Sequence, residues 1–209
     1  MRILTICPTF KRPELASQMS ASWFKTSTED NTLALGCDIG DPKLSAYKDI
    51  KSANKIFCKA GSTVTEVINS IYVQHPNYDF YHITNDDVIY HTHGWDSKFV
   101  NLSEEYGHGI FYGNDLLQGA NLCTFPFISA PIVKAVGWLQ LPTLNRYAGD
   151  VVWKFLGQSC NCLYYMGGVV IQHNHNGKID KRINKGDMGR FAKWLPSSNR
   201  EVNAIKGVL

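Results

Sequence analysis

Residues 78–95, YDFYHITNDDVIYHTHGW, place an asparagine and two adjacent aspartates directly after a run of aromatic and β-branched residues. The run predicts a buried strand over residues 78–84, and the Asn-Asp-Asp triplet at 85–87 falls just past its end. Neighbouring carboxylates repel each other, and burial makes each charge more costly. The triplet therefore predicts either a cation site or an Asp-rich turn or helix cap.

The rest of the first half alternates strand and helix patterns. Strands are predicted at residues 2–7, 33–37 and 55–58. Helices are predicted at 13–24, where Pro13 suits the first turn, and at 62–75, where apolar residues recur at helical spacing. Such alternation favours an α/β fold with a mostly parallel sheet, in which ligands bind beyond the carboxyl ends of the strands. The triplet lies at that edge.

The second half has a less regular pattern. Strands are predicted in GIFYGND (109–115), NLCTFPFIS (121–129) and CLYYMGGVVIQHNH (162–175), and helices in APIVKAVGWL (130–139) and AGDVVWKFLGQS (148–159). The residues after 176 are polar and basic, with Phe191 and Trp194 among them. No helix is predicted there.

The composition suits one compact domain with a full core, since 44% of the 209 residues are hydrophobic. The net charge of +3 is compatible with an anionic ligand. Six cysteines form no CxxC pair, so buried reduced thiols are expected. The apolar runs are too short for a secretory signal or a bilayer span, which predicts a cytoplasmic protein without membrane insertion.

The order of the motifs resembles that of the small nucleotide-sugar-dependent glycosyltransferases of the GT-A fold, family 2 type. The resemblance covers residues 2–176, and its strongest parts are CPTFKRP (7–13) and the triplet; GCDIGD (36–41), HGWDSKF (93–99), YAGDVVW (147–153) and VVIQHNHNGK (169–178) also match. It implies one Rossmann-like domain over residues 1–209. Residues 1–100 would bind the nucleotide sugar, 101–176 would form the acceptor and catalytic half, and 177–209 would be a basic C-terminal tail.

The resemblance also implies roles for individual residues. Asp87, the last residue of the triplet, is implied as a ligand of Mn²⁺ or Mg²⁺, while Asn85 stands at the first position of the family's D-x-D. Either Asp38 or Asp41 is implied to contact the base or ribose, because this chain has CDIGD where the family usually has DDGS. The residues matched to nucleotide-sugar binding are Pro8, Thr9, Arg12, Asp38, Gly61, Asn69, Asn85 and Asp86.

His173 and His175 end the last predicted strand, and their side chains project the same way because one residue separates them. The resemblance implies a third metal ligand near this point, with His175 favoured over His173. One structural and one solvated histidine is the alternative. A two-histidine zinc site fits less well, because carboxylates suit harder metals.

Asp150 opens a predicted helix and could simply cap it. In the resemblance, Asp150 matches the general base of inverting members, which takes the proton of the acceptor hydroxyl. One carboxylate can serve both purposes.

The expected function is metal-dependent transfer of a sugar from a nucleoside-diphosphate sugar, with a UDP-sugar favoured, to an acceptor hydroxyl. The expected acceptor is a polysaccharide or, as in the phage transferases that the chain resembles, a hydroxymethylated pyrimidine in DNA. A basic tail with aromatic residues suits such a polyanion, although a solvated basic face is the plainer interpretation. Two other classes remain: a nucleotidyltransferase, which would usually have a Gly-rich loop where CPTFKRP stands, and a non-catalytic nucleotide- or sugar-binding module.

Overall fold

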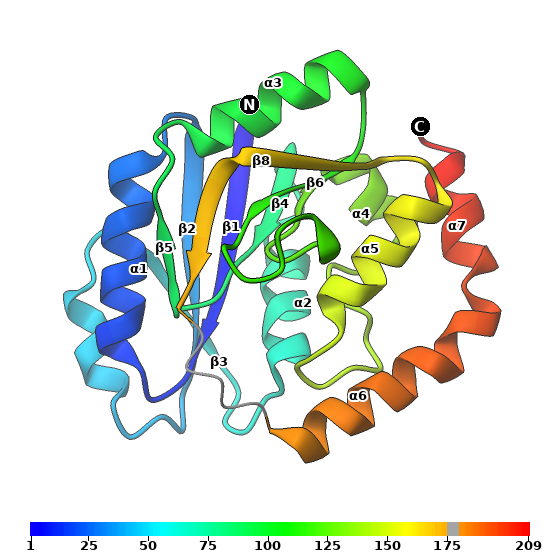
Figure 1. Ribbon diagram of the computed structural model, residues 1–209. Helices are drawn as coiled ribbons and strands as arrows, with labels where there is room; N and C mark the ends of the chain where they lie inside the picture. The colour runs from blue at the N-terminus through cyan, green and yellow to red at the C-terminus, as the bar shows by residue number, and fades with distance from the viewer. Residues whose placement is uncertain (175–179) are drawn as a thin grey trace.

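An eight-stranded mixed sheet with the order β3-β2-β1-β4-β7-β6-β8-β5 forms the centre of the computed structural model, which describes residues 1–174 and 180–209 (Figure 1). The four strands of the first half are all parallel, which confirms the predicted α/β class. They are β1 (Arg2–Thr9), β2 (Asp30–Asp38), β3 (Asn54–Cys58) and β4 (Phe80–Ile83).

The second half adds β5 (Val88–Tyr90), β6 (Ile110–Asn114), β7 (Phe127–Ser129) and β8 (Leu163–His173). β7 lies antiparallel between β4 and β6, and β6 pairs parallel with β8. β5 pairs antiparallel with β8, and the register places Val88 opposite His173. The acidic triplet, which precedes Val88, therefore meets the end of β8.

Helices cover both faces of the sheet because its strands are apolar on both sides. In β1, Leu4 and Ile6 belong to the core under one helical layer, whereas Ile3 and Cys7 belong to the core under the other. The first layer holds α2 (Val64–Gln74), α4 (Ala130–Val136) and α5 (Gly149–Ser159), and the second holds α1 (Pro13–Thr26) and α3 (Trp95–Tyr106). Short 3-10 helices occur at η1 (Leu44–Asp49), η2 (Gly119–Asn121) and η3 (Leu195–Ser197).

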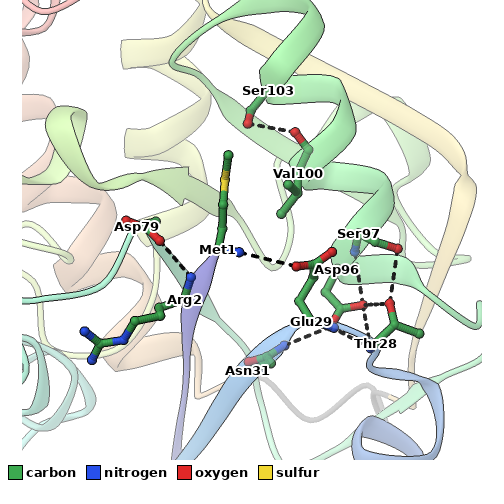
Figure 2. Close-up of polar contacts among 10 residues, drawn as sticks. All are labelled: Met1, Arg2, Thr28, Glu29, Asn31, Asp79, Asp96, Ser97, Val100 and Ser103. Carbon is green, nitrogen blue, oxygen red and sulfur yellow. Dashed lines mark hydrogen bonds and ion pairs between the residues drawn. The ribbon is translucent and has the colours of Figure 1, made fainter.

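Helix α3 and strand β5 were not predicted, and the strand predicted at 121–129 is confined to the three residues of β7. Asp96 in the first turn of α3 is fully buried. Its carboxylate accepts hydrogen bonds from the backbone N–H groups of Thr28 (2.9 Å) and Glu29 (3.0 Å), as Figure 2 shows. These bonds fix α3 to the connection between α1 and β2, and so explain why a polar sequence forms a packed helix.

The residues predicted as a polar tail fold into α6 (Lys181–Trp194) and α7 (Asn199–Lys206), which run along the outside of the domain (Figure 1). Trp194 and Ile205 are buried, so these helices are part of the packed structure. All six cysteines are free and buried, as predicted. None of the described helices combines the length and the apolarity that crossing a bilayer needs.

Candidate active site

A pocket of about 410 Å³ lies beyond the carboxyl ends of β1 and β4, beside the start of α5 and one side of α6. Six residues singled out in the sequence line this pocket: Pro8, Arg12, Asn85, Asp87, Asp150 and His173. A more open hollow of about 460 Å³ near α1 and β3 contains none of them. Because the residues singled out in the sequence converge only in the first of these two pockets, we take it as the candidate active site.

Arg12 lies between the two aspartates of the triplet. Its Nη2 is 2.7 Å from Asp86 Oδ1, and its Nη1 is 3.2 Å from Asp87 Oδ2. Burial raises the pKa of Asp86 to about 6 despite this contact. Burial also acts to raise the pKa of Asp87, but His173 and Arg12 together lower it. Asp87 is therefore the more readily ionised of the two carboxyl groups.

A hydrogen-bond network holds the loop that carries Arg12. The Thr9 hydroxyl donates to Asp86 Oδ2 (2.7 Å), and it lies 3.2 Å from the Tyr47 hydroxyl. The Tyr47 hydroxyl accepts a hydrogen bond from the Arg12 backbone N–H (3.1 Å) and donates one to the Asp41 carboxylate (3.2 Å). Thr9 and Asp41 thus orient the loop from behind the pocket.

Asp87 and His173 are suited to share a divalent cation. Asp87 Oδ1 is buried and lies 3.4 Å from His173 Nε2. Over residues 1–174 and 180–209, no group of three or more His, Cys, Asp or Glu side chains could hold a metal; His175 lies outside the described residues. Mg²⁺ commonly takes only one or two ligands from protein and the rest from phosphate and water. The pair therefore fits a metal–diphosphate complex rather than a closed metal cage.

Asp150 is the second residue of α5 and lines the pocket. Ala148, with a left-handed φ of 65°, precedes the helix. The Asp150 carboxylate accepts the Val151 N–H at 2.9 Å, so it also satisfies a donor of the first turn. Burial raises the pKa of Asp150, with a smaller contribution from Asp115. A carboxylate of raised pKa beside a ligand pocket has the properties of a general base.

Asp115, which sequence analysis did not single out, also lines the pocket. Its Oδ1 accepts the N–H groups of Leu117 (3.0 Å), Gln118 (2.7 Å) and Gly119 (3.0 Å), and its Oδ2 is buried. Burial acts to raise the pKa of Asp115, but the three N–H groups lower it. The signal was available, because the aspartate of GIFYGND follows a predicted strand just as the triplet does.

Three predicted nucleotide-binding residues have structural contacts outside the lining of the pocket. Asp38 accepts the N–H of Gly61 at 2.8 Å, so these two matched positions lie together. The Asn69 amide donates to the carbonyl of Gln140 (2.7 Å) and accepts the N–H groups of Leu139 and Gln140 (2.9 Å each). Asn69 is thereby joined to the pocket through Gln140, and its own contact with a nucleotide stays a prediction.

Solved structures that resemble this one include a mannosyltransferase, a glucosyl-3-phosphoglycerate synthase and TarS. The mannosyltransferase PcManGT from Pyrobaculum calidifontis, in complex with GDP-Man and Mn²⁺, matches 99% of this chain and 69% of its own at a TM-score of 0.71 and 11% identity. Glucosyl-3-phosphoglycerate synthase from Mycobacterium tuberculosis matches 96% of this chain and 78% of its own, at a TM-score of 0.63 and 10% sequence identity. TarS of S. aureus matches 82% of this chain at a TM-score of 0.63 and 10% sequence identity. This chain spans only 36% of the length of TarS.

No family model and no curated protein sequence matches the chain. At sequence identities of 10–11%, the likeness to these proteins is one of fold. In the mannosyltransferase and the synthase, it extends over nearly the whole of this chain. The chain has the GT-A fold of the nucleotide-sugar-dependent glycosyltransferases.

Proposed function

We propose that this chain is a metal-dependent glycosyltransferase that moves a sugar from a nucleoside-diphosphate sugar to an acceptor hydroxyl with inversion. The observation that supports this most is the convergence of Asp87, His173 and Asp150 on one pocket at the ligand-binding edge of a GT-A sheet. A UDP-sugar is the favoured donor. TarS has been solved with UDP-GlcNAc and the synthase with UDP, although PcManGT holds GDP-Man.

Asp87 and His173 would hold Mn²⁺ or Mg²⁺ together with the donor diphosphate. When bound, such an ion neutralises charge on the departing nucleoside diphosphate. Arg12 would add a second positive charge at the same end of the pocket, because its guanidinium already lies against both aspartates.

Asp150 would take the proton of the acceptor hydroxyl as that oxygen attacks the anomeric carbon and the bond from this carbon to the diphosphate breaks. We assign this role to Asp150 rather than Asp115 because the pKa of Asp150 is raised and that of Asp115 is lowered. A single displacement of this kind inverts the anomeric centre. The acceptor would be a polysaccharide or a hydroxymethylated pyrimidine in DNA, met in the cytoplasm.

Calorimetric titration with nucleoside diphosphates and their sugars, in Mn²⁺ and then in EDTA, tests the donor site. We expect a uridine nucleotide to bind only with metal, and Asp87→Ala to abolish this binding. Asp150→Asn is the matched control, because it should retain the donor while losing turnover on glycan and hydroxymethylated DNA acceptors. Binding without metal, or no binding across the panel, would remove the proposal; full turnover by Asp150→Asn would remove the assigned base.

A further inference from the structure

The pocket contains two arginines in different electrostatic situations. Arg12 is paired with Asp86 and Asp87. Arg146 also lines the pocket and is exposed, but no carboxylate of the described residues lies within ion-pair distance of its guanidinium. Its Cζ lies 5.4 Å from the centre of the Tyr147 ring. Arg146 is thus a cation that lines the pocket without an ion pair to a described carboxylate, although its charge also acts to lower the pKa of Asp86.

The backbone of Arg146 is held by a buried carboxylate from α6. Asp187 is fully buried, and it accepts the N–H groups of Asn145 (2.9 Å), Arg146 (2.9 Å) and Tyr147 (2.8 Å). The charge of Asp187 is balanced by Arg190, whose Nη1 lies 3.0 Å away. The loop is therefore fixed through its backbone, and the Arg146 side chain is left free to bind a ligand.

Helix α6 adds positive charge on the same side of the pocket. Asn184 and Met188 of this helix line the pocket. Lys181 and Lys185 are exposed and share their side of the helix, because residues three and four apart lie together. The single acidic residue of α6 is the buried Asp187. Apart from the N-cap Asp180, the described residues of α6 thus present a cationic face beside Arg146.

We propose that Arg146 binds a phosphoryl group carried by the acceptor, with Lys181 and Lys185 attracting that anion to the pocket. This inference rests on the proposed function. A guanidinium binds phosphate oxygens through two parallel hydrogen bonds, which gives it both affinity and orientation. Arg146 precedes Asp150 by four residues in the chain, and both residues line the same pocket. A phosphoryl group on Arg146 would therefore place the rest of the acceptor near the proposed base.

Arginine side-chain NMR tests this at the residue itself, with Arg146→Lys used to identify the Nε–Hε resonance of Arg146. Inorganic phosphate is titrated into the whole protein saturated with UDP and Mg²⁺. We expect the Arg146 resonance to shift with phosphate, and Arg146→Ala to weaken phosphate binding by about tenfold while leaving UDP affinity unchanged. Lys193→Ala is the control, because Lys193 is an exposed cation of the same helix that does not line the pocket.

Two results would overturn the proposal. A resonance that shifts with UDP and Mg²⁺ alone, with UDP affinity lost in Arg146→Ala, would assign the guanidinium to the donor diphosphate. A resonance that responds to neither ligand would exclude phosphoryl binding. If UDP does not bind the wild-type protein, the proposed function fails by itself, and the phosphate titration without UDP still decides whether Arg146 binds a phosphoryl group.

Discussion

His173 Nε2 lies 3.4 Å from Oδ1 of Asp87, because the antiparallel pairing of β5 with β8 brings the end of one strand to the start of the other. The Asn174 N–H donates to the Asp87 carbonyl at 2.8 Å and fixes the same junction. A loop aspartate and a strand-end histidine are thus held together by main-chain pairing.

His173→Gln should weaken Mn²⁺ binding by about tenfold or more, since it removes one of the two proposed protein ligands. The loss should be smaller than that caused by Asp87→Ala, which also removes the charge. Titration of Mn²⁺ followed by electron paramagnetic resonance measures the affinity directly. His91→Gln is a matched control, because His91 is exposed and bonded to Gln172 outside the pocket. Equal effects of the two substitutions would argue against His173 as a ligand.

Asp150→Asn should lower kcat by about 10²–10⁴-fold, the usual contribution of a general base, and leave donor affinity unchanged. Steady-state kinetics with calorimetry separates the two effects. A variant that loses donor affinity and turnover together would show that Asp150 serves the donor site or the start of α5 instead.

The pH dependence of turnover should also identify Asp150. Its raised pKa means that the carboxylate takes up a proton at a higher pH than an ordinary aspartate does. Activity should therefore fall as the pH drops through this raised value, at a higher pH than an ordinary aspartate would give. The profile of kcat against pH measures it. An acid limb at the ordinary value for aspartate, or none, would contradict the assignment.

The sequence was sufficient for the half of the fold that is built from local signals. The first four strands alternate with helices whose starts are marked by Pro13 and by the capping box of Thr63 and Glu66. The rule that ligands bind at the carboxyl ends of strands placed the triplet at the ligand-binding edge of the sheet, where Asn85 and Asp87 line the pocket. These features could be predicted because each depends on residues that are close together in the chain.

The missed elements depend on contacts between distant residues. β5 is three residues long, too short to show a period, and it exists because β8 pairs with it. α3 is a polar helix fixed through the buried Asp96, and α6 is fixed through the buried Asp187. An aspartate that binds backbone N–H groups from another segment resembles a surface residue in sequence. Arg146 was missed for the same reason, because Asp187 places it.

Asn69→Ala should destabilise the protein by about 2–3 kcal/mol, since the buried N–H groups of Leu139 and Gln140 lose their acceptor. Asn69→Asp keeps that acceptor and should cost less. Urea unfolding measures the stability, and calorimetry under folded conditions should find donor affinity unchanged. Donor affinity lost at full stability would instead support the nucleotide contact that the resemblance implies.

His82 should make stability depend on pH in the acid range. It is fully buried, with Nε2 2.9 Å from the Tyr90 hydroxyl and Nδ1 3.2 Å from the Pro126 carbonyl oxygen. Burial lowers the pKa of His82 to about 4. Between its unfolded pKa of about 6.5 and this value, the unfolded chain binds a proton that the folded chain does not. The free energy of unfolding should therefore fall as the pH drops through this window, by about 3 kcal/mol in all.

His82→Gln removes the titrating group and can keep the hydrogen bond to Pro126, so it should be less stable at neutral pH but lose less on acidification. Asp86 acts in the opposite direction, because its pKa is raised to about 6 and the folded state binds its proton first. Both proteins contain Asp86, so the difference between their urea unfolding curves isolates His82. The two stabilities should converge as the pH falls, and curves that stay parallel would show that His82 is not the group responsible.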